Sequence, residues 1–231
     1  MTENYGVVVK SEGCNINNND INNCSRGIIL QNSQNNKIHN NNISNTLYGI
    51  GLQYSNKNEI YENNLINNKL TGIYLSDGDI NKIKNNTIVG NSYGIALSFE
   101  RNSMILNNMV KNNSDQGLNV YSCENTVISS NVFSNNSFGI FLYNNDINIT
   151  IKKNIIMKSQ LGIYVPSKLQ NHTIEKNIFS EVKEKIFFEN EISKESNLPI
   201  QIMIIISSLV IIDLVIFNLV WKRKKNKKKE N

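Results

Sequence analysis

The sequence predicts an all-β solenoid of about eight stacked coils, followed by one transmembrane helix. Three observations lead to this prediction. A glycine followed by an apolar residue recurs every 21 to 23 residues, an asparagine recurs at nearly the same interval, and a 22-residue apolar segment lies near the C-terminus. Two independent registers at one period indicate a repeat architecture, in which each unit buries its apolar face against its neighbours.

The glycine column marks the start of each coil. One and three residues after it stand apolar pairs such as Ile28/Leu30 and Ile73/Leu75. Alternation with a period of two is strand behaviour, so each coil should hold short strands with an inward apolar face. The column consists of Gly6, Gly27, Gly49, Gly72, Gly94, Gly117, Gly139 and Gly162.

The asparagine column indicates a repeated turn. An isoleucine stands three residues before each of these asparagines. Asparagine suits a turn because its side chain can hydrogen-bond the backbone and tolerates a left-handed conformation, and stacked amides can also bond one another. We therefore expect a structural turn ladder made of Asn19, Asn41, Asn63, Asn86, Asn108, Asn131, Asn154 and Asn177.

The full repeat carries a family resemblance. The pattern G-[IV]-x-[LV]…N-x-I-x-x-N-x-[IVLF], as in GIYLSDGDINKIKNNTIV (Gly72 to Val89), resembles the parallel β-helix repeat. It is similar to NosD-type periplasmic proteins associated with copper, and to carbohydrate-binding and sugar-hydrolase β-helix domains. The resemblance covers residues 5–180 and implies a right-handed parallel β-helix with three parallel sheets. It says little about function, because one fold hosts many activities.

The ends of the repeat array differ from its middle. We predict β-helix repeats over residues 1–180 and a degenerate capping coil and linker over 181–199, where Lys185 replaces the next glycine. A strand at Ile186-Phe187-Phe188 followed by charges would shield the last edge of the stack. At the other end Gly6 comes only five residues after the start, so we expect this chain to begin inside an array.

The C-terminal segment predicts a single-pass membrane protein. Residues 200–221 are long and apolar enough to span a bilayer, and Trp221 stands at the boundary before a run of lysines and arginine. The positive-inside rule then places the basic tail, 222–231, in the cytoplasm and the β-helix outside the cell membrane. Asp213 lies near the middle of the span, where it either pairs with a partner helix or stays protonated or snorkels.

The charge distribution argues against a nucleic-acid partner. The tail holds seven basic residues and one acidic residue, which gives it a net charge of +6. Because the net charge of the whole chain is +5, the rest of the chain carries −1. Nucleic-acid binding depends on clustered lysine and arginine, which the repeat region lacks.

No cofactor or metal site is predicted. Copper sites need clustered imidazole, thiolate or thioether groups. The histidines, His39 and His172, are about six coils apart, and Met104 and Met109 share one coil without further ligands.

The three cysteines, Cys14, Cys24 and Cys123, have no metal-like spacing. Cys14 and Cys24 are either joined by a disulfide or fill the coil as small hydrophobic residues, and we favour the second interpretation.

Charged residues gather seven positions after the glycines. Neighbouring coils should bring Asp79, Arg101 and Glu124 within side-chain reach, with Asp77 close by. Polysaccharide lyases and hydrolases with this fold use carboxylates with a basic residue or calcium, and glycoside hydrolysis needs two carboxyl groups flanking one bond. The alternative is an exposed ladder of alternating charges with little effect on stability, which we favour. The column reads Gly13, Gln34, Asn56, Asp79, Arg101, Glu124, Asp146 and Leu169.

Aromatic residues stand two and four positions after several glycines. These positions should point outward, which would give a flat strip suited to stacking on sugar rings. The alternative is ordinary strand propensity, since tyrosine and phenylalanine are favoured in sheets. The predicted strip consists of Tyr121, Phe141, Tyr143 and Tyr164, with Tyr74 further along the stack.

Three functional hypotheses remain. The first is a non-enzymatic protein of the cell surface that binds glycans or partner proteins through a rigid stack. The second is a polysaccharide-active enzyme, a lyase or a glycoside hydrolase, for which Asp77, Asp79, Arg101 and Glu124 are the catalytic candidates. The third is an accessory protein of a transport or copper-insertion system, which the NosD resemblance alone implies.

Overall fold

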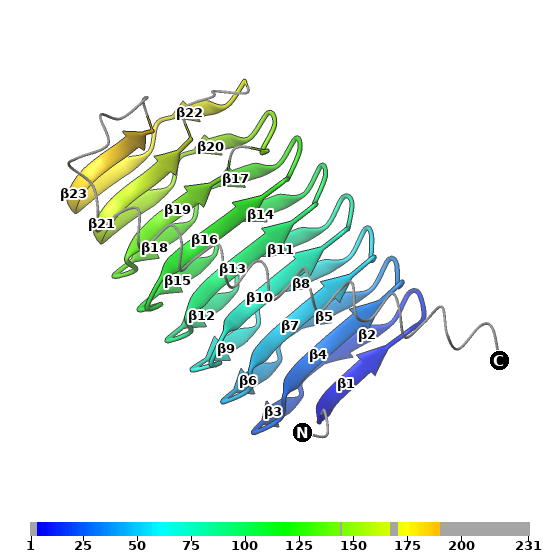
Figure 1. Ribbon diagram of the computed structural model, residues 1–231. Coiled ribbons are helices and arrows are strands. Elements are labelled where there is room, and N and C mark those ends of the chain that lie inside the picture. Colours follow the sequence, from blue (N-terminus) through cyan, green and yellow to red (C-terminus); the bar gives the residue numbers. More distant parts are fainter. Residues whose placement is uncertain (1–3, 144, 167–170, 190–231) are drawn as a thin grey trace. The chain divides into compact units, whose positions relative to one another are not determined.

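The repeat region folds as one stack of parallel β coils (Figure 1). The computed structural model describes residues 4–143, 145–166 and 171–189. Every strand pairing in this part of the chain is parallel, and paired residues such as Ile73 and Ile95 stand one repeat apart. The predicted parallel β-solenoid is therefore confirmed.

Each coil contributes one strand to each of three faces. The first face holds the longer strands β1 (Tyr5–Val9), β4 (Arg26–Gln31), β7 (Tyr48–Gln53), β10 (Thr71–Ser76), β13 (Tyr93–Ser98), β16 (Gln116–Tyr121) and β19 (Phe138–Leu142). The second face holds β2 (Asn15–Asn17), β5 (Lys37–His39), β8 (Glu59–Tyr61), β11 (Lys82–Lys84), β14 (Met104–Leu106), β17 (Val127–Ser129), β20 (Thr150–Lys152) and β22 (Thr173–Glu175). The third face holds β3 (Asp20–Asn22), β6 (Asn42–Ser44), β9 (Asn64–Ile66), β12 (Thr87–Val89), β15 (Met109–Lys111) and β18 (Val132–Ser134).

The last coils depart from this plan. β21 (Ile155–Val165) and β23 (Ile178–Phe188) run without a break from the third face into the first. They join those two faces into one 15-stranded sheet, and the second face is a separate 8-stranded sheet. We call the connection between the first and second faces the first turn, that between the second and third faces the second turn, and that between the third face and the next coil the third turn.

The core is a set of aliphatic columns along the stack. The predicted inward residues, such as Ile28, Leu30 and Ile60, are fully buried. The glycine column has a steric cause that the period alone does not reveal. A Cβ atom on Gly72 would lie 2.8 Å from the carbonyl oxygen of Gly94 in the next coil, so a side chain there would push adjacent coils apart.

The predicted asparagine ladder occupies the second turn and is structural. Asn86 Oδ1 accepts hydrogen bonds from the backbone N–H and the side-chain Nδ2 of Asn63, both at 3.0 Å, and Asn63 Nδ2 also donates to the Ile38 carbonyl at 2.9 Å. One part of the expectation is wrong, because the column asparagines are not left-handed. The residue before each one is, as at Glu62 and Asn85, with φ of 55° and 57°.

Two further amide ladders were not predicted. In the first turn, the backbone N–H of Asn36 donates to Asn58 Oδ1, and that of Asn58 to Asn81 Oδ1. In the third turn, the same bond links consecutive members of a longer series. These ladders satisfy backbone groups that each coil buries where it bends. The third-turn series is Thr46, Asn68, Asn91, Asn113 and Asn136.

The C-terminal coil pairs with the stack as a strand. β23 pairs with β21 along its length, including Ile186 with Ile163, so regular pairing continues through the predicted boundary at residue 180. Cys14 and Cys24 are free thiols that pack against the core from different turns of the first coil.

The predicted membrane span at 200–221 and the tail at 222–231 lie outside the described residues. Among the residues that the structure does describe, no helix is long and apolar enough to cross a bilayer.

Candidate functional site

The first turn gathers most of the predicted site residues. In each central coil two residues with positive φ bracket this turn, for example Phe99 at 55° and Asn102 at 50°. The chain between them turns one side chain inward, Glu100, and the next one outward, Arg101. Repeating this geometry at each coil creates one buried column and one exposed column along the same edge.

The exposed column contains the predicted charge ladder. Isolated parallel bridges align Asp79 with Arg101 and Arg101 with Glu124, as the sequence predicted. Arg101 Nε lies 3.9 Å from Glu124 Oε2, with both side chains largely in solvent. Such an exposed ion pair contributes at most about 1 kcal/mol, so the pair has little value for stability.

The register of the seventh coil differs from the prediction. Ile147, not Asp146, pairs with Glu124, because this coil has one additional residue in the turn. The shift turns Asp146 inward, where it is fully buried. A constant spacing from the glycine places Asp146 in the exposed column, and the additional residue is why that prediction was wrong.

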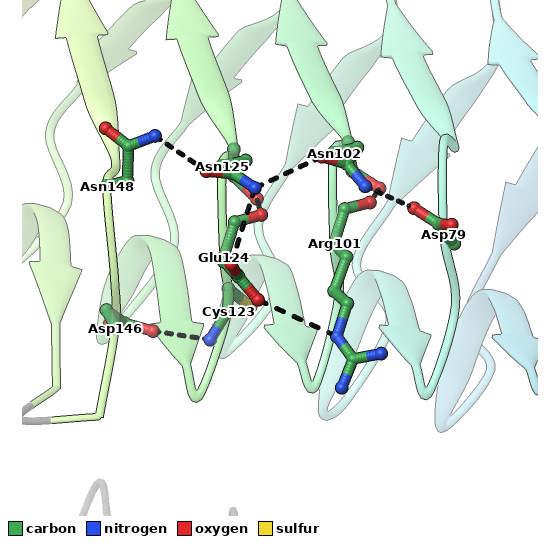
Figure 2. Close-up of polar contacts among 10 residues, drawn as sticks. Asp79, Arg101, Asn102, Cys123, Glu124, Asn125, Asp146 and Asn148 are labelled. Carbon is green, nitrogen blue, oxygen red and sulfur yellow. Dashed lines mark hydrogen bonds and ion pairs between the residues drawn. The ribbon is translucent and has the colours of Figure 1, made fainter.

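An exposed amide ladder runs beside the charges and was missed (Figure 2). Asn102 Nδ2 donates to Asp79 Oδ1 at 2.8 Å, and Asn148 Nδ2 donates to Asn125 Oδ1 at 2.6 Å. Between them, Asn125 Nδ2 donates to Asn102 Oδ1 at 3.3 Å. The 23-residue spacing of these asparagines was a signal in the sequence that could have revealed the ladder.

The buried column holds two carboxyl groups, that of Asp146 and that of Glu100, and the sequence gave no reason to single out Glu100. Glu100 Oε2 accepts hydrogen bonds from Ser103 Oγ at 2.8 Å and Asn81 Nδ2 at 3.1 Å. Its Oε1 atom, which fills the space that the missing side chain of Gly78 leaves, has no hydrogen-bond partner among the described residues. Burial raises the pKa of Glu100 to about 7, against the hydrogen bonds that lower it.

Asp146 connects two coils at the same edge. Its Oδ1 accepts the backbone N–H of Cys123 at 2.8 Å, and its Oδ2 accepts that of Tyr143 at 2.7 Å. Burial raises the pKa of Asp146 to about 8. Neither Asp146 nor Glu100 is exposed to solvent, so neither carboxyl group can touch a ligand on the surface.

The aromatic strip is smaller than predicted and partly elsewhere. Phe141 and Tyr164 are only 1% and 3% exposed, and Tyr74 is 3% exposed. The rings of Phe141 and Tyr164 stack with centroids 4.2 Å apart, so each covers a face of the other. These residues cannot form the exposed strip that alternation along the strand indicated.

Tyr121 and Tyr143 remain partly exposed and join a residue that the sequence did not single out. Phe99 is 42% exposed at the first turn, and its ring meets that of Tyr121 at 5.5 Å. Tyr121 meets Tyr143 at 5.5 Å in the next coil. In both pairs the edge of one ring packs against the face of the other, which is a favourable geometry. This geometry does not cover both faces of every ring. We call Phe99, Tyr121 and Tyr143 the aromatic ladder.

This edge combines aromatic rings, amides and charged groups. Rings can stack on apolar faces of a ligand, amides and carboxylates can accept and donate hydrogen bonds, and Arg101 adds a charged donor. No group of three or more histidine, cysteine, aspartate or glutamate side chains within the described residues could hold a metal ion. His39 instead stacks on Tyr61, and His172 Nδ1 accepts the Ile149 backbone N–H.

Solved structures with a similar fold include proteins named for polysaccharide chemistry and for adhesion. A variant of the periplasmic alginate epimerase AlgG superposes with a TM-score of 0.62 at 18% identity, covering 74% of this chain and 49% of that one. An alginate lyase from Paenibacillus sp. gives 0.53 at 14%, covering 81% and 77%. PfbA, a surface adhesin of Streptococcus pneumoniae, gives 0.53 at 15%, covering 76% and 64%.

At these identities the similarity concerns the fold alone. This chain spans about half the length of the epimerase. No curated protein matches the sequence. The family described as "Right handed beta helix region" matches residues 2–98 and 44–179, which together cover most of the chain. The protein therefore belongs to the family of right-handed β-helix proteins.

Proposed function

We propose that this protein is a non-enzymatic binding protein of the cell surface, and that the first turn of its central coils binds glycans. The observation that carries the proposal is the aromatic ladder lying along the same turn as Arg101, Glu124 and the exposed amide ladder. Sugar rings offer both apolar faces and hydroxyl groups, so they match an edge that combines rings with amides and charges.

The fold supports a glycan ligand. Two of the similar solved structures are named for alginate, which is a polysaccharide, and the third for adhesion at a cell surface. A solenoid presents the same turn at each coil, so a polymer can lie along several coils at once. Exposed aromatic groups that lie in a row often mark an interaction site.

The test is a pull-down of the full chain on insoluble polysaccharides, namely chitin, cellulose, α-1,3-glucan and cross-linked alginate. The triple variant Phe99→Asn, Tyr121→Ser and Tyr143→Ser should lose retention on whichever material binds the parent. Asparagine tolerates the left-handed conformation of Phe99, so the fold should persist. Tyr61→Ser, on the second face, is the matched control and should bind as the parent does. A triple variant that is retained like the parent would contradict the proposal.

A second candidate function is a polysaccharide-active enzyme. The alignment of Asp79, Arg101 and Glu124 on one exposed edge favours it, because two carboxyl groups beside a cation are the groups that such chemistry uses. The double variant Asp79→Asn with Glu124→Gln removes both carboxyl groups and leaves the aromatic ladder in place. Release of reducing sugar by the parent that disappears in this double variant would establish the enzyme instead.

We also propose that residues 200–221 anchor the protein in the cell membrane, with the β-helix outside and residues 222–231 in the cytoplasm. The apolar segment and the basic run after Trp221 support this topology. A protease added to intact cells should digest the β-helix and spare an epitope fused to the tail. A protected β-helix in cells whose surface controls are cleaved would reverse the orientation.

A further inference from the structure

A groove of about 470 Å³ lies at the third turn, on a different edge from the aromatic ladder. Its lining comes from the last four coils, from the residues that follow β15 and β18 and from the middle of β21 and β23. Its size falls in the range of ordinary ligand pockets, which hold roughly 300–1,000 Å³. Its lining includes Asn113, Asn136, Lys158, Ser159, Glu181 and Lys183.

The groove forms where the third-turn amide ladder stops. Asn113 and Asn136 are bonded to each other at 3.0 Å and are buried at its floor. The next two coils place Ser159 and Val182 in this column, so no amide fills the turn. In the same coils the chain passes from the third face to the first without a turn, as the continuous strands β21 and β23. A smaller side chain and a straighter backbone therefore open a hollow that the earlier coils close.

The groove carries three charged side chains, which come from the third turn of the last two coils. Lys158 and Glu181 continue the left-handed column of Asn112 and Asn135, and Lys183 follows two positions later. All three charged side chains are exposed. Within the described part of the chain, neither lysine forms an ion pair at this turn. The net charge of the lining is +1, and amides and hydroxyl groups make up the rest.

We propose that this groove binds an acidic glycan, with Lys158 and Lys183 on its carboxylate or sulfate groups and the serine, glutamine and asparagine side chains on its hydroxyl groups. Lysine ammonium groups are donors suited to such anions. Uncharged amides and hydroxyls can exchange hydrogen bonds with sugar hydroxyls in either direction. The site is separate from the aromatic ladder and does not depend on the function proposed for it.

The test measures binding of the full chain to oligogalacturonate, dextran sulfate and neutral dextran by titration calorimetry at low salt. The parent should bind at least one acidic probe and bind neutral dextran more weakly. Each exposed ion pair contributes up to about 1 kcal/mol, so Lys158→Gln with Lys183→Gln should weaken binding by up to about 25-fold. Glu181→Gln should strengthen it by a few-fold, because a repelling carboxylate is removed.

Two further variants separate charge from shape. Lys153→Gln is the control for Lys158→Gln, since Lys153 is also exposed and left-handed but lies at the second turn, and it should leave binding unchanged. Ser159→Asn should weaken binding without a change of charge, because the amide would fill the hollow. The two acidic probes distinguish carboxylate from sulfate recognition.

The proposal is overturned if the parent binds neither acidic probe, or binds neutral dextran equally well. It is also overturned if the double lysine variant, with a circular dichroism spectrum like the parent's, binds as tightly as the parent. Loss of binding in the aromatic triple variant but not in the lysine variant would assign the acidic glycan to the first turn instead.

Discussion

The second turn of this solenoid has one left-handed residue in each coil, whereas the first turn has two in each central coil, and the side chains of the two turns differ as well. At the second turn asparagine occupies one column in every coil from Asn19 to Asn177, and each amide bonds the next. At the first turn the buried column changes from Ser55 to Gly78 to Glu100 to Cys123 along four successive coils. One edge is uniform and the other is not.

The difference indicates which edge is free to carry function. A uniform amide column satisfies buried backbone groups at every step, so substitution there is penalised in the same way along the whole stack. The first turn instead tolerates buried carboxyl groups, exposed rings and left-handed residues with large apolar side chains, such as Ile80 and Phe99. Departures of this kind cost stability and gather at functional sites.

The largest effect should come from interrupting the uniform edge. Asn108→Ala removes the acceptor for the Asn86 backbone N–H and the donor for the Ile83 carbonyl, both of which are buried. Leaving two buried backbone groups without partners should lower the free energy of unfolding by about 3 kcal/mol. Urea denaturation measures the change. Asn125→Gly, in the exposed first-turn ladder, is the control and should change stability by less than about 0.5 kcal/mol, and equal losses at both sites would remove the distinction between the edges.

The next effect concerns pH. The pKa of Glu100 in the folded protein, about 7, lies above its ordinary value of 4.5, so the folded state holds this proton more tightly than the unfolded state. Its contribution to stability is complete below about pH 4.5 and is lost as the pH rises through about 7, on the order of 3 kcal/mol in total. Glu100→Gln should therefore be more stable than the parent at pH 8 but not at pH 4.

Denaturant titrations of parent and variant across this range test the sign. The pKa of Asp146 is also raised, and this group is present in both proteins. The difference between their free energies of unfolding therefore reports Glu100 alone. A difference that stays constant from pH 4 to pH 8 would mean that the pKa of Glu100 is the same in the folded and unfolded states.

The smallest effect concerns backbone strain at the irregular edge. Ile80 has a φ of 57° in a column that contains Asn102 and Asn125 in later coils. A left-handed residue with a branched side chain costs about 1–2 kcal/mol, so Ile80→Asn should raise the free energy of unfolding by about 1 kcal/mol. The reverse change, Asn102→Ile, should lower it and also removes the bond to Asp79. If Ile80→Asn destabilises the protein, the apolar contacts of this side chain outweigh the strain.

Periodicity was sufficient to predict the fold. The glycine, isoleucine and asparagine columns set the coil length, the inward residues and the parallel pairing, because stacking makes each column experience one environment. The two additional amide ladders escaped notice because their columns mix asparagine with cysteine, serine or threonine.

The candidate site was predictable only in part. The alignment of Asp79, Arg101 and Glu124 followed from the period, but the inward turn of Asp146 depended on one additional residue in its coil. Alternation along a strand predicts on which face of the sheet a side chain lies. It does not predict how much of that face other side chains cover, so Phe141 and Tyr164 were wrongly predicted to be exposed.

The second-turn amides all donate in one direction. Asn19 Nδ2 donates to Asn41 Oδ1, and the same bond repeats at each coil until Asn154 donates to Asn177. Hydrogen bonds in such a chain polarise one another, so each is strengthened by the bonds on both sides of it. Within the described residues, the amides at the two ends of this series, Asn19 and Asn177, bond a neighbour on one side, so the backbone hydrogens of their coils should exchange faster than those of the coils between them. The aromatic ladder occupies the fifth, sixth and seventh of the eight coils, so its rings lie beside amides that are bonded on both sides.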